Sequence, residues 1–567
     1  MSVAVEQAGI DYHVVLAQNA LQQCIDQPEL QSEFICALVK QTSRHTQHRL
    51  GVQQLLLCAT QSLFTCDTQS PAANGSGENA DAQSTASTSH SPPLMQGHST
   101  STILDCKTNP AQYVLIQGWQ LLALAVSLFL PRNNRLLWYL KLHLQRNADT
   151  KTECGKYAAY CERALERTLQ NGGREVKPSR MEVLSILMKN PYHHSLPHAI
   201  PVHFLNGTYQ VVSFDGSTTI EEFLNTLNQE IGCRDVHQSG FTLFSDDPIE
   251  KDLEHFIDLQ AKLCDIISKW ETALREKGSG KFENTRVIQL TYKSRCYWRQ
   301  AAKMETDRER LLLCYQINQQ VVQGKFPVNR ELAFELASLM AQIDFGEYNN
   351  DKARGSGPGC NPHHLVLQAL DKFYPIRYRT NITAEQLREL QEKLQEKWIA
   401  LKGRSVLDCV RIYLTCTRKW PFFGATLYQA KLKQAEPITV WIAVSEDSVT
   451  LLELQTMAVM CRYNYANIVT FGGCLDDFML VACPDEGAAE QKLLFALSKP
   501  KILEITLLIA DYMNALGHTL PGTPQMNTLT RNGSHRSIKS TLRPTTGSGC
   551  LPTQPDILKS TPDHQRP

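Results

Sequence analysis

An apolar stretch near the N-terminal end limits the folds that are open to this chain. The segment GWQLLALAVSLFLPRNNRLLWYLKLHL runs from Gly118 to Leu144. A helix that spans a bilayer needs about 20 apolar residues. The unbroken apolar run here covers only Leu121 to Leu130, contains Ser127, and ends at Pro131. A run of this length is typical of a buried core helix, and we therefore expect no transmembrane segment.

The apolar residues after Pro131 follow a helical period. One predicted helical face carries Leu136, Leu137, Leu140 and Leu144, whereas Arg132, Arg135 and Lys141 fall outside that face. The upstream segment PELQSEFICALVKQTSRH, residues 28–45, has the same amphipathic spacing. The N-terminal part of the chain is therefore predicted to be an all-α domain whose buried helix precedes an amphipathic one.

Composition narrows the class of protein. The chain has 567 residues, of which 42% are hydrophobic and 20% charged, as expected for several globular domains. Lys+Arg and Asp+Glu both number 57, so attraction of the whole molecule to nucleic acid is not expected. The N-terminus lacks a secretory signal, and the 18 cysteines include no CxxC pair. These features favour a cytoplasmic protein with reduced thiols.

Changes in composition divide the chain into segments. Residues 67–109 are rich in Ser, Ala, Gly and Asn, and predict a disordered insertion within a helical domain of residues 1–170. Residues 171–198, which include NGGREVKPSR, are interpreted as a linker. The tail, residues 518–567, is rich in Thr, Pro, Ser and Gly and is also predicted to be disordered.

Strand and helix signals alternate in the central and C-terminal parts. Asn206-Gly207 between two strand-like segments predicts a hairpin, and Thr218 with Glu221 predicts a capping box that opens the next helix. Residues 199–295 therefore suggest a ubiquitin-like β-grasp lobe. Residues 296–418 read as amphipathic helices. Residues 419–517 read as short strands and one closing helix, which suggests a pleckstrin-like sandwich.

This order of lobes resembles a FERM domain, and the block before it resembles a myosin tail homology 4 (MyTH) domain. NRELAFELASLMAQIDFGEY and GRSVLDCVRIYLTCTRKWPFFGATLYQAKL resemble FERM segments, and LQSEFICALVKQTSRH and the Gly118–Leu144 stretch resemble the MyTH domain. The resemblance implies a multidomain α+β fold. In that fold an all-α bundle precedes a ubiquitin-like lobe, a helical lobe like acyl-CoA-binding protein, and a pleckstrin-like lobe with a closing helix.

Among families with this tandem, IDYHVVLAQNALQQCIDQPELQ is most similar to the non-motor pleckstrin-homology-domain family H. Against that pattern, the chain starts part-way into the tail homology domain, and the pleckstrin domain expected upstream is absent. The sequence is therefore also consistent with a fragment, a short isoform or an incomplete gene model.

Three short motifs suggest catalysis or metal binding but lack the residues that such chemistry requires. Asp344-Phe345-Gly346 matches a kinase tripeptide, yet the HRD and APE motifs are missing. GSGKF, residues 278–282, lacks the Gly and the Ser or Thr of a phosphate loop, because Arg275 and Phe282 stand at those positions. CNPHH offers Cys360, His363 and His364 without a second cluster. We therefore expect no enzyme, no cofactor and no metal.

Two binding surfaces are predicted instead. The first is a basic patch of Lys40, Arg44, His48 and Arg49, with a second basic set at Lys151, Lys156, Arg163 and Arg167. An ordinary solvated face is the simpler interpretation of both. The second surface is a peptide groove in the pleckstrin-like lobe, beside a sheet edge and the closing helix. The residues assigned to it are Ile468, Val469, Thr470, Phe471, Leu503 and Leu507.

The resemblance implies a non-catalytic cytoskeletal adaptor at the cytoskeleton or the periphery of the plasma membrane. Its expected partners are cytoplasmic tails of membrane receptors, microtubules or actin, and a phosphoinositide membrane. Three alternatives stay open at this point. They are a truncated fragment without function, the cargo-binding tail of a motor, and an enzyme with a site that the sequence does not reveal.

Overall fold

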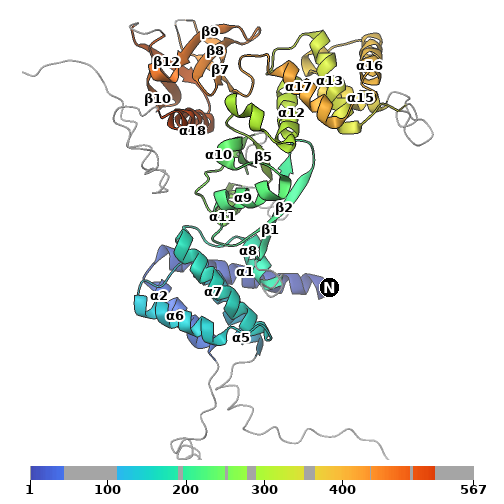
Figure 1. Cartoon of the computed structure of the whole chain (residues 1–567). Coiled ribbons are helices and arrows are strands. Elements are labelled where there is room, and N and C mark those ends of the chain that lie inside the picture. The colour runs from blue at the N-terminus through green and yellow to red at the C-terminus, as the bar shows by residue number, and fades with distance from the viewer. Residues whose placement is uncertain are drawn as a thin grey trace, which may run out of the picture. The chain divides into compact units, whose positions relative to one another are not determined.

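The chain forms two compact units in a computed structural model (Figure 1). One unit contains residues 1–200, 211–223 and 261–288, and the other contains residues 201–210, 224–260 and 289–567. The structure describes residues 2–43, 112–188, 196–248, 253–277, 289–349, 364–434, 436–484 and 489–517. The predicted insertion, residues 67–109, and the predicted tail, residues 518–567, lie outside these described residues.

The first unit contains a bundle of α-helices around an apolar core. The helices are α1 (Ser2–Asp26), α2 (Leu30–Thr42), α5 (Gln112–Val126), α6 (Asn134–Asn147), α7 (Glu153–Asn171) and α8 (Arg180–Met188). Helix α5 packs against α2, α7 and α8, and its Trp119, Leu122 and Val126 are almost fully buried. The apolar stretch of the sequence is thus a buried helix followed by the amphipathic α6, as predicted. In the described part of the chain, no helix is both long and apolar enough to cross a membrane.

Helix α8 corrects the predicted linker at residues 171–198. Its Val183 and Ile186 are 1% exposed and belong to the core of the bundle. The backbone N–H of Arg174, also inside the predicted linker, donates to Leu128 O at 2.7 Å. The sequence suggested a flexible linker because it contains Gly172, Gly173 and Pro178. The apolar side chains of α8 nevertheless pack into the core of the bundle, where α8 contacts α1 and α5.

The ubiquitin-like lobe is built on a five-stranded sheet of order β2-β1-β5-β3-β4. Strand β1 runs parallel to β5, and β3 is antiparallel to both β5 and β4. This arrangement is the predicted β-grasp. Its elements are β1 (His198–Phe204), β2 (Tyr209–Phe214), α9 (Ile220–Ile231), α10 (Val236–Ser239), β3 (Phe241–Asp246), β4 (Glu254–Phe256), α11 (Leu263–Lys277) and β5 (Leu290–Ser294).

Local sequence signals explain the β1–β2 hairpin turn and the start of helix α9 in this lobe. Gly207 has φ 83°, a left-handed conformation that suits glycine, and the predicted hairpin forms there as Phe204 N donates to Thr208 O at 2.9 Å. The capping box of α9 uses Thr219 and Glu222, one residue later than predicted. The Thr218 hydroxyl instead accepts from Asp215 N at 3.0 Å and donates to the Asp215 carboxylate at 2.8 Å, so it is engaged by the turn that precedes the helix.

The second lobe is helical. Its helices are α12 (Asp307–Val322), α13 (Arg330–Phe345), α15 (His364–Phe373), α16 (Ala384–Ile399) and α17 (Val406–Thr417). Helix α13 packs against α15, α16 and α17, and the side chains of Leu336, Ala337 and Met340 on it are fully buried. Ser405 caps α17 as its sequence predicts, because Asp408 N donates to Ser405 Oγ at 3.1 Å.

The third lobe is a strand-rich sandwich with a closing helix. Its strand order is β10-β11-β12-β6-β7-β8-β9, and every pairing is antiparallel. Its elements are β6 (Thr426–Leu432), β7 (Ile438–Val444), β8 (Ser448–Glu453), β9 (Val459–Asn464), β10 (Ile468–Cys474), β11 (Asp477–Ala482), β12 (Gln491–Ala496) and α18 (Lys499–Ala515). Helix α18 packs on β10, β11 and β7, and its Ile505, Ile509 and Tyr512 are fully buried.

Candidate protein-interaction sites

Strand β10 is an edge strand, as the sequence predicts. It stands at one end of the third-lobe sheet and pairs with β11, with Thr470 opposite Val481. The register shifts between Ile468 and Thr470, which marks an irregularity at the start of the strand. An edge strand presents backbone N–H and C=O groups that an added strand can pair with.

Helix α18 provides an apolar wall beside this edge. Leu503 is 38% exposed and Leu507 is partly buried, and the two lie four residues apart on one helical face. The side chain of Ile502 approaches the strand closely, since a Cβ added at Gly473 would lie 3.4 Å from Ile502 Cγ2. On the strand, Val469 is 44% exposed and Thr470 is partly exposed.

Two of the six residues assigned to the groove from sequence lie in the core. Ile468 is 4% and Phe471 is 7% exposed, and both belong to the apolar cluster between the sheet and α18. The register shift between Ile468 and Thr470 gives the reason. Strict alternation would place residues three apart on opposite faces of the sheet, whereas an extra residue in the strand returns Ile468 and Phe471 to the same face. The accessible candidates are therefore Val469, Thr470, Leu503 and Leu507. We name these four residues the β10–α18 surface.

The basic patch is described only in part. Lys40 lies exposed in the last turn of α2, whereas Arg44, His48 and Arg49 fall outside the described residues. In the second basic set, Arg167 is engaged in ion pairs. Its Nε lies 2.9 Å from Asp215 Oδ2, and its Nη2 lies 2.6 Å from Glu222 Oε2. Arg167 therefore holds the bundle to the ubiquitin-like lobe and is not part of an open cationic surface.

A second ion-pair network within the same unit is fully buried. The side chain of Arg174 is 0% exposed, its Nη1 bonds the Glu182 carboxylate of α8, and its Nε donates to Asp265 Oδ1 of α11 at 2.8 Å. The Lys177 carbonyl accepts a hydrogen bond from Ser268 Oγ of α11 at 2.6 Å. The segment from Arg174 to Lys177, which was predicted to be part of a linker, is thus hydrogen-bonded to α11, and the bond from Arg174 is charge-assisted.

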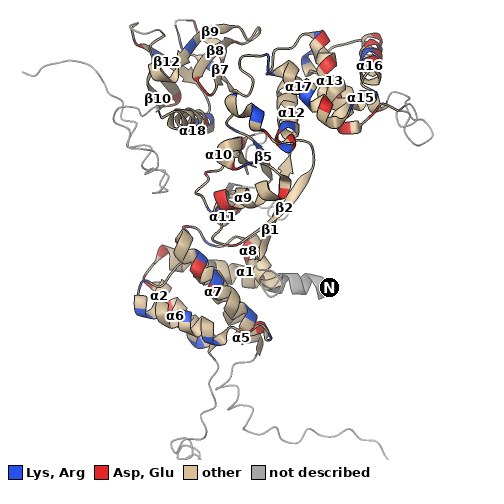
Figure 2. Cartoon of the chain, in the orientation of Figure 1, with Lys and Arg blue, Asp and Glu red and all other residues tan. Residues whose placement is uncertain are grey.

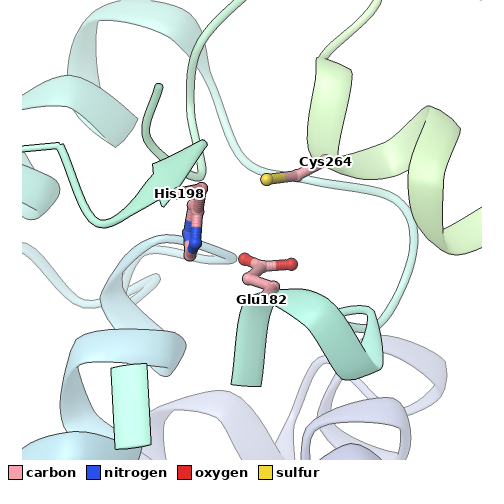
Figure 3. Close-up of side chains that lie close together, drawn as sticks. All are labelled: Glu182, His198 and Cys264. Carbon is pink, nitrogen blue, oxygen red and sulfur yellow. The ribbon is translucent and has the colours of Figure 1, made fainter. Parts of the chain in front are cut away.

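Beside this network, Glu182, His198 and Cys264 converge from α8, β1 and α11 (Figure 3). Their ligand atoms lie within 4.8 Å of one another, and all three residues are buried. A cysteine binds zinc as its thiolate. Burial raises the pKa of the Cys264 thiol well above its usual value, and Arg174 already neutralises the Glu182 carboxylate. The Glu182 carboxylate is therefore already engaged in an ion pair, and burial favours the neutral thiol of Cys264 beside it.

The short motifs rejected from sequence have structural explanations where the structure describes them. Asp344 accepts a hydrogen bond from Tyr315 Oη at 2.7 Å and pairs with Lys372 Nζ at 2.7 Å, at the end of α13. Both of its carboxylate oxygens therefore stabilise the second lobe. His364 lies in α15 beside Gln368. The segment 278–282, Cys360 and His363 lie outside the described residues.

Models of three domain families match successive parts of the chain. Residues 101–185 match the MyTH4 domain, residues 196–296 match the RA like domain, and residues 299–428 match the FERM central domain. These matches follow the order of the helical bundle, the β-grasp lobe and the helical lobe. The chain contains a MyTH4 domain followed by a FERM central domain, and it has the fold of MyTH4–FERM tandems. MyTH4 and FERM domains are protein-interaction modules.

Two curated relatives of the tandem come from Drosophila melanogaster. Uncharacterized protein CG43867 is 66% identical over 574 residues, which cover 97% of this chain. Myosin-VIIa is 29% identical over 349 residues, which cover 57% of this chain. The matched regions span 30% of the first relative and 14% of the second.

Two solved structures share the fold of the tandem. The human myosin 7b C-terminal MyTH4-FERM domain, in complex with the harmonin-a PDZ3 domain, has a TM-score of 0.56 at 17% identity. The match covers 72% of this chain and 76% of the chain in that structure. The MyTH4-FERM MF1 domain of Dictyostelium discoideum myosin VII has a TM-score of 0.55 at 18% identity. The match covers 72% of this chain and 77% of the chain in that structure.

The ionic contacts of Arg167 and Arg174 were missed from sequence, although they join the MyTH4 helices to parts of the first FERM lobe. Arg174 lies in NGGREVKPSR, whose glycines and proline are typical of a loop. A buried arginine has the same local pattern as an exposed one. The burial of Arg174 depends on its ion pairs with Glu182 and Asp265, and Asp265 is 91 residues away from it in sequence.

Proposed function

We propose that this MyTH4–FERM tandem is a non-catalytic adaptor that links receptor tails at the plasma membrane to microtubules or actin. The β10–α18 surface is the observation that carries the proposal. There, a strand with an open edge adjoins the accessible side chains of Leu503 and Leu507. An extended peptide that adds to β10 gains backbone hydrogen bonds, and its alternate side chains contact the helix.

The related structure of human myosin 7b supports protein binding as the activity, because it contains the harmonin-a PDZ3 domain. For the present chain, a cytoplasmic receptor tail is the partner that suits an edge strand. Such tails are commonly extended and unstructured, so they can order as a strand when they bind. Phosphoinositide lipids would contribute by holding the FERM lobes at the same membrane.

The first experiment tests strand addition on the full chain. An array of peptides from cytoplasmic receptor tails is screened against the wild type, and the bound peptides are retested on Val469→Glu, Leu503→Glu and Thr470→Pro. We expect each substitution to weaken binding about tenfold or more, because it places a charge in an apolar contact or removes a backbone donor. Hydrogen exchange of the amides in β10 should slow when a peptide binds.

The matched control is Val459→Glu on β9, the strand at the other end of the sheet. Val459 is 55% and Val469 is 44% exposed, so the two substitutions perturb folding to a similar degree. Circular dichroism establishes that each variant is folded. Equal peptide affinity for the Val469→Glu and Val459→Glu chains would place the cargo outside the β10–α18 surface.

The similarity to Drosophila myosin-VIIa favours a second candidate, in which the same module is the cargo-binding tail of a motor. Both candidates use the β10–α18 surface in the same way. They differ in what the full-length product contains. Mass spectrometry of the endogenous protein separates them, since peptides from a motor domain would be present in one case only.

A further inference from the structure

Helix α6 has an exposed face that the bundle does not use. Its buried side contains Leu140, His143 and Leu144. The opposite side carries residues that recur at positions i, i+3, i+4, i+7 and i+11, which place them on one face of a helix. These residues, which we name the α6 stripe, are Arg135, Trp138, Tyr139, Leu142 and Arg146.

The α6 stripe has the composition of an interface. Trp138 is 69%, Tyr139 is 59% and Leu142 is 41% exposed. Trp, Tyr and Arg are enriched in the central contacts of protein interfaces, where charged residues other than Arg are depleted. Two large aromatic residues next to each other on one solvent-facing helix are not needed by the core, because the other face of α6 already fills it.

The central ring of the stripe is held in place before any partner binds. Lys141 Nζ lies 5.5 Å from the centroid of the Trp138 ring, and the same ammonium pairs with Glu166 Oε1 of α7 at 2.6 Å. The ring therefore has a cationic neighbour that is itself fixed to the bundle. A side chain that is ordered beforehand loses less conformational entropy when it becomes buried in a complex.

The charges of the stripe define the chemistry of its partner. Helix α6 contains no Asp or Glu, and Arg135 and Arg146 stand at the two ends of the apolar centre. Figure 2 shows the Lys and Arg residues of the helices in blue. Within the part of the chain that the structure describes, neither arginine makes a salt bridge. A complementary surface therefore carries carboxylates at both ends and apolar side chains between them.

The form of the partner follows from the backbone. The stripe offers side chains but no open sheet edge, so a segment laid along it must satisfy its own backbone hydrogen bonds. A helix does so. The stripe runs about 16 Å, since 11 residues each rise 1.5 Å, which matches three turns of a partner helix. A membrane surface fits less well, because electrostatic attachment to anionic lipid commonly uses 4–8 clustered basic residues.

We propose that the α6 stripe binds an acidic amphipathic helix of a partner protein. This surface is separate from the β10–α18 surface, so the two proposals can fail independently. The tandem would then have one site for an extended cargo peptide and another for a helical partner.

The test uses a phage-displayed library of helical peptides selected on the full chain. The recovered peptides are then measured by fluorescence anisotropy against the wild type, Trp138→Ala and Arg135→Glu. We expect the selected peptides to carry Asp or Glu on both sides of an apolar stripe. Trp138→Ala should weaken their binding about tenfold or more, and Arg135→Glu should weaken it and reduce its dependence on salt.

Two control variants separate this site from others. Tyr12→Ala on α1 removes an aromatic side chain that is 63% exposed, close to the value for Trp138, and should leave peptide affinity unchanged. Val469→Glu on β10 should also have no effect on these peptides. Because Trp138 is largely exposed, Trp138→Ala should keep the wild-type circular dichroism and thermal transition.

Each contrary outcome overturns the proposal. Selected peptides that bind Trp138→Ala as tightly as the wild type place their site elsewhere. Equal affinity for polyglutamate reduces the stripe to a general cationic surface. Phosphatidylserine vesicles that sediment the wild type but not Trp138→Ala, with no peptide recovered, identify a lipid surface. Peptides that bind only after deletion of residues 67–107 show that the chain itself covers the stripe.

Discussion

Arg174 shows at the scale of one residue how the MyTH4 and FERM sequences depend on each other. Its guanidinium lies between Glu182 and Asp265. The side chain of Arg174 is 0% exposed, that of Glu182 is 1% exposed and that of Asp265 is 11% exposed. Removing one partner from a buried ion pair leaves the others without compensation for their lost hydration. We expect Arg174→Met to destabilise the first unit by about 3–5 kcal/mol, measured by urea denaturation monitored through tryptophan fluorescence.

A compensating variant distinguishes charge from packing at this position. Arg174→Met combined with Glu182→Gln and Asp265→Asn removes all three charges and should recover part of the lost free energy of unfolding. Arg163→Met, at an exposed position on α7, serves as the matched control and should change that free energy little. No recovery in the triple variant would mean that the side chains contribute by shape and hydrogen bonding rather than by charge.

At the scale of elements, α8 and α11 define where the FERM domain can be cut. Helix α11 receives Arg174 and the Lys177 carbonyl, and Glu271 on it accepts from Arg180 N at 2.6 Å. A FERM fragment that begins at Ala199 lacks all three partners. We expect the amides of residues 263–277 to exchange hydrogen faster in that fragment than in the full chain. Equal exchange rates in the two proteins would show that α11 is stable without α8.

At the scale of the whole molecule, an adaptor needs a cytoskeletal contact as well as a cargo site. The basic patch is the candidate, and of its residues the structure describes Lys40, exposed at the end of α2. Charge reversal at Lys40, Arg44 and Arg49 should reduce co-sedimentation with microtubules, and added salt should do the same, because the Debye length is only about 10 Å at 0.1 M. Reversal at Arg388 on α16, an exposed arginine outside both basic sets, is the control. Equal pelleting of both variants would identify the patch as an ordinary solvated face.

The candidate sites could be predicted from sequence only as far as local pattern allows. The expected pleckstrin-like sandwich has a sheet edge beside its closing helix, and the position of β10 at the end of the sheet confirms that edge. Which of its residues are accessible could not be predicted, because Ile468 and Phe471 face α18 from a distant part of the chain. The α6 stripe was visible as periodic spacing, yet the leucines on the other face gave an adequate account of the helix.

Local sequence was sufficient for the type and order of most elements, and hence for the fold, whereas α8 was taken for a linker. Helical periods, the Asn206-Gly207 turn and the Ser405 cap act between residues a few positions apart, so they can be recognised without tertiary contacts. The roles of Arg167, Arg174 and Cys264 depended on neighbours far away in sequence. The free energy of a charge or a thiol is set by burial and by the groups placed beside it, and those exist only once the chain has folded.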